Sequence, residues 1–247
     1  MILLTEATKD WVKDCDDWLI APAGVPWIKE GYQIQVGEGS YVGDGVQIGE
    51  AVHIGEEVLI CDWVYIGDGV HIGDGVRINK KVTISDDVTI GEGVDISEGV
   101  IIGKGVIIGD RVRIGEGVII GKGAVIGDRV RIGDGAIIGK GVKIGEGVRI
   151  GKGVKIGEAV RIGKGVKIGD RAIICDEVII GDRALIGGQV HISCYSKIGE
   201  EVHIGEGVHI GDQVIIGDGA NVGKYSCICK GVLIGENSVT PEYSILK

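Results

Sequence analysis

The chain has 247 residues, a net charge of −10, 47 Gly, 3 Pro and no Phe. Because aromatic side chains are so scarce, Ile and Val must supply most of any core, and both favour strands. The negative charge argues against binding nucleic acid or an anionic membrane surface. No apolar run approaches the roughly eighteen residues that a membrane-spanning helix needs.

Residues 1–35 precede the regular part of the sequence and are predicted to form an N-terminal cap. Trp11, Cys15 and Trp18 follow the spacing i, i+4, i+7, which predicts an amphipathic helix over residues 5–17. A loop containing two prolines follows this helix. We expect the segment to cover strand edges that would otherwise pair with other chains.

Residues 36–239 repeat every six residues. In steps of six from Val36 to Ile234, all 34 positions are Ile or Val, and the next residue is Gly in 27 of the 34 cases. The residue two places earlier is Val, Ala or Ser after the first step. This pattern predicts a short strand with two inward side chains and one outward side chain, followed by a glycine-rich corner. Such strands can bury their inner face only by stacking coil upon coil, about 4.8 Å apart.

The six-residue pattern resembles the hexapeptide-repeat superfamily, related to bacterial hexapeptide acyltransferases. The resemblance implies an all-β fold, a left-handed parallel β-helix of triangular cross-section with three hexads, or about eighteen residues, per coil, and hence about eleven coils. Residues 98–174 use only eight residue types, which is typical of a repeat-expanded or designed member. Thr240-Pro241 is predicted to end the repeat, leaving residues 240–247 as a C-terminal cap.

A step of eighteen residues connects equivalent positions on one face. It places His191, His209 and Cys227 in one row, about 4.8 Å apart, with Cys175 and Cys194 near the adjoining corner. Such a row could be a metal site, a thiol–imidazole pair or a set of solvent-facing side chains without chemistry. Because a flat row offers only about two ligands at tetrahedral geometry, no metal site is predicted.

Outward isoleucines on one face predict an interaction surface. The residues concerned are Ile101, Ile119, Ile137 and Ile173. The partner we expect is another copy of the chain, in a homotrimer. Six cysteines without the spacing of a disulfide framework, and no signal-peptide pattern, favour reduced thiols in a cytoplasmic protein.

Two hypotheses for the function follow. In the first, the chain is a structural scaffold, a rod-like assembly or binding module without a cofactor, since 34 hexads contain no insertion that could build a pocket. The alternative, implied by the resemblance, is a coenzyme-A-dependent acyltransferase with its active site between subunits. His191 and His209 are then the candidate catalytic bases, with acetyl-CoA or another acyl donor as cosubstrate.

Overall fold

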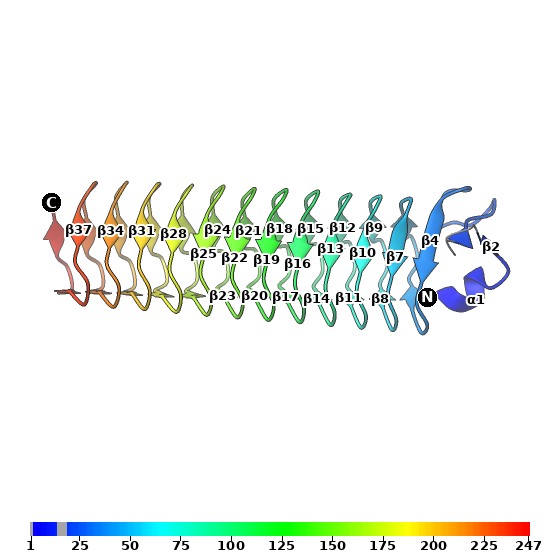
Figure 1. The fold of residues 1–247 in the computed structure, drawn as a ribbon, viewed down its shortest axis with the longest axis horizontal. Coiled ribbons are helices and arrows are strands. Elements are labelled where there is room, and N and C mark those ends of the chain that lie inside the picture. The colour runs from blue at the N-terminus through cyan, green and yellow to red at the C-terminus, as the bar shows by residue number, and fades with distance from the viewer. Residues whose placement is uncertain (1, 14–18) are drawn as a thin grey trace. The chain divides into compact units, whose positions relative to one another are not determined.

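The computed structural model describes residues 2–13 and 19–247, and its contacts divide the chain into two units, Met1–Gly117 and Val118–Lys247. In each unit, short strands recur coil after coil (Figure 1). The predicted fold class is confirmed: the protein is an all-β, left-handed parallel β-helix. Among the described residues, no helix has the length and hydrophobicity needed to cross a bilayer.

The N-terminal segment differs from its prediction. The helix α1 (Leu4–Thr8) ends well before residue 17, and β2 (Val12–Lys13) follows as a strand. Val12 pairs in antiparallel register with β3 (Leu19–Ile20), which in turn pairs with β4 (Gln33–Val36). The prediction of a helix over residues 5–17 was wrong beyond Thr8, because residues 12–13 form a strand that extends the open edge of the first coil. Cys15 and Trp18 lie outside the described residues.

The first strand protects a second edge of the same unit. β1 (Ile2–Leu3) pairs in antiparallel register with β5 (Tyr41–Val42), and the Leu4 N–H donates to Ser40 O at 2.8 Å. Trp11 stacks on Trp27 with ring centroids 5.4 Å apart. The pairing of β1 with β5 occupies one strand edge of the first coil.

The first unit builds three ladders of parallel strands, each strand pairing with the one eighteen residues later. The first ladder contains β5, β8 (Leu59–Ile60), β11 (Arg77–Ile78), β14 (Asp95–Ile96) and β17 (Arg113–Ile114). The second contains β4, β7 (Val52–Ile54), β10 (His71–Ile72), β13 (Thr89–Ile90) and β16 (Ile107–Ile108). The third contains β6 (Gln47–Ile48), β9 (Tyr65–Ile66), β12 (Thr83–Ile84) and β15 (Ile101–Ile102).

The second unit repeats this arrangement. One ladder contains β20 (Arg131–Ile132), β23 (Arg149–Ile150), β26 (Lys167–Ile168), β29 (Leu185–Ile186), β32 (His203–Ile204), β35 (Asn221–Val222) and β38 (Val239–Thr240). Another contains β19 (Val125–Ile126), β22 (Lys143–Ile144), β25 (Arg161–Ile162), β28 (Ile179–Ile180), β31 (Lys197–Ile198), β34 (Ile215–Ile216) and β37 (Leu233–Ile234). The last contains β18 (Ile119–Ile120), β21 (Ile137–Ile138), β24 (Lys155–Ile156), β27 (Ile173–Ile174), β30 (His191–Ile192), β33 (His209–Ile210), β36 (Cys227–Ile228) and β39 (Ile245–Leu246).

The repeat does not stop at Thr240-Pro241, so the prediction of a separate C-terminal cap was wrong. Ile245 pairs with Cys227 in parallel register, as any other strand of that ladder would. Thr240 is β-branched and takes the inward position with only 6% of its surface exposed, so it replaces the usual Val or Ile. Pro241 falls in a corner, where proline is tolerated.

The core is a stack of inward isoleucines and valines. The repeat-position isoleucines from Ile54 to Ile228 expose at most 4% of their surface. Each contributes about 1.5–3 kcal/mol relative to an exposed side chain. Where Ser replaces the inward Val, its hydroxyl is satisfied: Ser196 Oγ donates to Gly211 O at 2.9 Å and accepts from the Val214 N–H at 3.3 Å. The outward residue of each strand is therefore left for surface chemistry.

The corners between the strands share a left-handed backbone residue, and several of them share an aspartate that bonds to the backbone of the preceding coil. The third residue of a corner adopts the left-handed backbone, with φ of 57° at Arg129 and 66° at Gly141, for example. An aspartate at the second position reaches back one coil, so that Asp182 Oδ1 accepts the backbone N–H of Lys164 at 2.8 Å. The acidic corners thus serve the backbone by satisfying N–H groups that no strand pairs.

Candidate functional site

The candidate catalytic residues lie in one row of outward side chains in the second unit. We call this row the His191 column. Its members are Ile119, Ile137, Lys155, Ile173, His191, His209, Cys227 and Ile245, each paired in register with the next. The predicted adjacency of His191, His209 and Cys227 is confirmed, and the column also contains three of the isoleucines predicted to form an interface.

His191 and His209 stack on one another. Their ring centroids are 4.8 Å apart and their planes are inclined by 48°. His191 is half-buried, whereas His209 is exposed. Burial, and then the neighbouring His209, lower the pKa of His191 below its ordinary value, with Asp212 opposing them. The lowered pKa favours the uncharged imidazole, which is the form that can accept a proton.

A thiol lies against the same imidazole. The Cys175 Sγ is 3.6 Å from the His191 Nε2. Cys175 is the first residue of the corner that follows β27, so the contact joins a corner to the outward residue of the next coil. Burial raises the pKa of the Cys175 thiol, and a hydrogen bond with Cys194 acts in the same direction. The pair is thus a neutral thiol beside a neutral base, the arrangement of a base-assisted nucleophile.

The sequence predicts that Cys175 and Cys194 lie near the row, but it does not predict the contact between Cys175 and the His191 ring. A spacing of eighteen residues identifies only residues that are neighbours within one ladder, whereas Cys175 and His191 are sixteen residues apart. No group of three or more His, Cys, Asp or Glu side chains among the described residues is arranged to hold a metal ion. The cysteines within those residues are free thiols.

A second histidine pair lies in the first unit and was not predicted as a site. His53 Nδ1 is 2.9 Å from Gln35 Oε1, and its ring stacks on that of His71 with centroids 5.9 Å apart. Since Gln Oε1 can only accept, His53 Nδ1–H donates and leaves Nε2 unprotonated. Burial, and then His71, lower the pKa of His53. The step of eighteen from Gln35 to His53 could have revealed the contact between these two residues.

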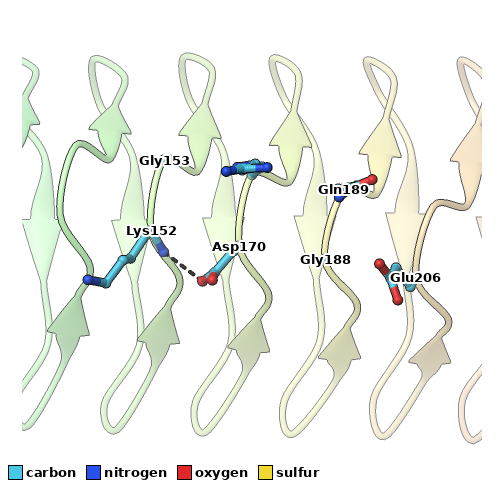
Figure 2. Close-up of a pocket in the computed structure, with 7 residues that line it drawn as sticks. Lys152, Gly153, Asp170, Gly188, Gln189 and Glu206 are labelled. Carbon is cyan, nitrogen blue, oxygen red and sulfur yellow. Dashed lines mark hydrogen bonds between the residues drawn. The ribbon is translucent and has the colours of Figure 1, made fainter.

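A surface pocket of about 480 Å³ lies on the corner that precedes β30 (Figure 2). Gly188 takes a position that carries a charged side chain in neighbouring coils, and so opens a gap between Asp170 and Glu206. The Lys152 N–H donates to Asp170 Oδ1 at 2.8 Å. The lining residues are Lys152, Gly153, Asp170, Arg171, Gly188, Gln189 and Glu206. Two cationic and two anionic side chains line the pocket, so it does not select a ligand of one charge.

The predicted interface residues are exposed. Ile119, Ile137 and Ile173 expose 42%, 40% and 40% of their surfaces, with Lys155 between the last two. Ile101, in the first unit, exposes 45%. Their role in an interface stays a prediction, but the row that holds His191 is also an apolar surface.

Two family models match the chain. The model described as the GMPPB C-terminal domain matches residues 60–148 and 124–215, which together exceed half of the chain. The model described as the hexapeptide repeat of succinyl-transferase matches residues 213–239. The chain belongs to the hexapeptide-repeat superfamily. No curated protein sequence matches this hexapeptide-repeat protein.

Several solved structures resemble this hexapeptide-repeat protein. The acetyltransferase domain of PglB from Neisseria gonorrhoeae is 25% identical over 40% of this chain and 51% of its own, with a TM-score of 0.37. UDP-N-acetylglucosamine acyltransferase from Campylobacter jejuni is 21% identical over 84% of this chain and 67% of its own, with a TM-score of 0.40. GDP-perosamine N-acetyl transferase from Caulobacter crescentus is 21% identical, covering 54% and 53% of the two chains, with a TM-score of 0.29. The match thus spans about half the length of the PglB domain.

Proposed function

We propose that this protein is a coenzyme-A-dependent acyltransferase whose reacting centre lies at His191. The observation that supports it best is a half-buried imidazole with a thiol 3.6 Å from its Nε2, and burial lowers the pKa of this imidazole. Membership of the hexapeptide-repeat superfamily, with a match to the hexapeptide repeat of succinyl-transferase, agrees with that chemistry. Transfer of an acyl group from a thioester requires a base to take the proton of the attacking group, and His191 can supply it.

A single copy of the chain does not enclose His191, because the hexads run without an insertion. We therefore propose that further copies of the chain, in a trimer, pack on the His191 column and provide the missing wall. Ile119, Ile137 and Ile173 lie in the same column as the imidazole, so an interface along them would also cover the reacting centre. Lys155 lies between Ile137 and Ile173 in this column, and its long side chain can carry its charge to the edge of such an interface.

The self-association can be measured directly. Static light scattering of the native protein at micromolar concentration should give the mass of three chains. Ile137→Glu should give monomers, because a carboxylate would be buried among apolar side chains. Arg131→Glu changes an outward residue of another ladder and should leave the trimer intact. A native monomer at that concentration would contradict the proposal.

Acetyl-CoA binding is the first test of the function. Calorimetric titration should detect binding of acetyl-CoA at or below millimolar concentration. His209→Ala should weaken the affinity about tenfold or more, through loss of the ring that packs against His191. His203→Ala removes an exposed histidine of another ladder and serves as the matched control. If calorimetry detects no heat of binding at millimolar acetyl-CoA, the proposal of a coenzyme-A-dependent function is wrong.

A structural scaffold is the second candidate, and one observation favours it. Residues 98–174 consist only of Gly, Ile, Val, Ala, Lys, Arg, Asp and Glu, so this stretch offers charge but no distinctive catalytic group. If acetyl-CoA does not bind while the chain still self-associates, the scaffold is the function that remains.

A further inference from the structure

Three cysteines occupy the same position in their hexads, and the outward residue beside each of them on the next coil differs. Cys61, Cys175 and Cys229 each follow a buried isoleucine and begin a corner. Sixteen residues later, on the next coil, the outward residue is Arg77 for Cys61, His191 for Cys175 and Ile245 for Cys229. Among these three thiols, only Cys175 has a base beside it, the His191 Nε2 at 3.6 Å.

We propose that Cys175 is a catalytic nucleophile that accepts the acyl group as a thioester before the group passes to its final acceptor. This inference rests on the proposed acyltransferase function and deepens it. The cluster supplies the two groups that covalent catalysis requires, a nucleophile and a base within reach, because the Cys175 Sγ lies 3.6 Å from the His191 Nε2. The charge of Asp212 raises the pKa of His191 and so favours the protonated imidazole that forms when His191 takes the thiol proton.

The step balances without any further reactant. The Cys175 Sγ attacks the thioester carbonyl carbon, a new carbon–sulfur bond forms, and the thiol proton passes to His191 Nε2. The tetrahedral intermediate then expels the sulfur of coenzyme A, which takes the proton back from His191. One thioester is broken and another is formed, so acyl-CoA and Cys175 thiol become coenzyme A and acyl-Cys175.

The second half of the reaction uses the same two residues. An acceptor amine or hydroxyl attacks the acyl-Cys175 carbonyl while His191 Nε2 takes its proton. Cys175 then leaves as a thiolate and receives that proton. Because burial raises the pKa of Cys175 and lowers that of His191, both groups return to their neutral forms between steps.

The test requires variants that fold. Serine already occupies the hexad position of Cys175 at Ser85, Ser97 and Ser193, so Cys175→Ser fits the corner. Asparagine already occupies an outward strand position at Asn221, so His191→Asn fits the ladder. Cys61 is the internal control, because burial also raises its thiol pKa and it is followed by an aspartate, as Cys175 is.

The experiment follows acetylation of each thiol by mass spectrometry. The full-length protein is incubated with acetyl-CoA and, separately, with the small thioester S-acetyl-N-acetylcysteamine, quenched in acid and digested with trypsin. Cleavage after Arg171 and Arg183 places Cys175 and Cys194 in different peptides, and Cys61 in a third. We expect Cys175 to be acetylated at least about tenfold faster than Cys61, and His191→Asn to remove this difference.

The outcomes separate the covalent step from the proposed function. In one outcome acetyl-CoA binds and Cys175→Ser still transfers acetyl groups, but Cys175 is acetylated no faster than Cys61. That outcome overturns the covalent step and leaves the proposed acyltransferase function intact. Fast, His191-dependent acetylation by the small thioester without acetyl-CoA binding supports Cys175 as nucleophile and overturns coenzyme A as donor. Slow acetylation by both reagents overturns the inference.

Discussion

Gly139→Ala should lower the free energy of unfolding by about 3 kcal/mol, near the upper end of the range for overpacked sites. A Cβ on Gly139 would clash with the carbonyl oxygen and carbonyl carbon of Gly157 on the next coil. Both atoms belong to the backbone of Gly157, whose N–H donates to Ile174 O at 2.8 Å, so they cannot move aside independently. The midpoint of thermal unfolding, followed by circular dichroism, should fall accordingly.

The matched control is two residues away. Gly141 has a φ of +66° and nothing within 4 Å of a Cβ, so Gly141→Ala adds only the strain of a left-handed alanine, about 1 kcal/mol. Ala159 already holds the equivalent corner position with a φ of 55°. If Gly139→Ala and Gly141→Ala unfold at the same temperature, close approach between coils does not explain the glycine that follows most repeat positions.

His191→Asn should lower kcat/KM for acyl transfer by about 10²- to 10⁴-fold, the range for removal of a general base. The change removes the proton acceptor while keeping a polar outward side chain of a kind that β35 already carries. Release of coenzyme A thiol, measured with a chromogenic disulfide, gives the rate. His203→Asn, on another ladder, should keep the native rate, and an unchanged rate in His191→Asn would rule out His191 as the base.

The pH profile provides an independent check of the same residue. The base must be neutral, and its pKa lies below the ordinary histidine value because of burial and then His209. The rate should therefore rise with pH through a midpoint below about 6.5 and level off above it. Since His209→Ala removes both a neighbouring charge and part of the cover over the ring, it should move this midpoint to higher pH.

The periodicity of the sequence predicted the fold because one six-residue unit determines strand, corner and pairing together. It failed at the two ends. At residues 12–13 pairing to an open edge outweighed helical spacing, and at Thr240 a β-branched polar residue served as an inward residue. In both places the decisive factor was a neighbouring strand rather than local preference.

The candidate site was predictable in part. His191 and His209 are eighteen residues apart, and register alone brings their rings together. The Cys175–His191 contact joins a corner residue to a strand residue sixteen positions later, and it depends on where two side chains reach rather than on register. A similar reach lets Asp182 accept the backbone N–H of Lys164.

The fixed register of the ladders also limits how such a chain can change in length. Within the second unit, removing or duplicating one hexad would rotate every later outward residue onto the next face, and His191 would leave the row of Ile119 and Ile137. Removing or duplicating three hexads would return each residue to its original face. Insertions and deletions of about eighteen residues are therefore the ones that preserve both the reacting centre and its apolar surround, so this protein can vary its length in whole coils without redesigning its surface.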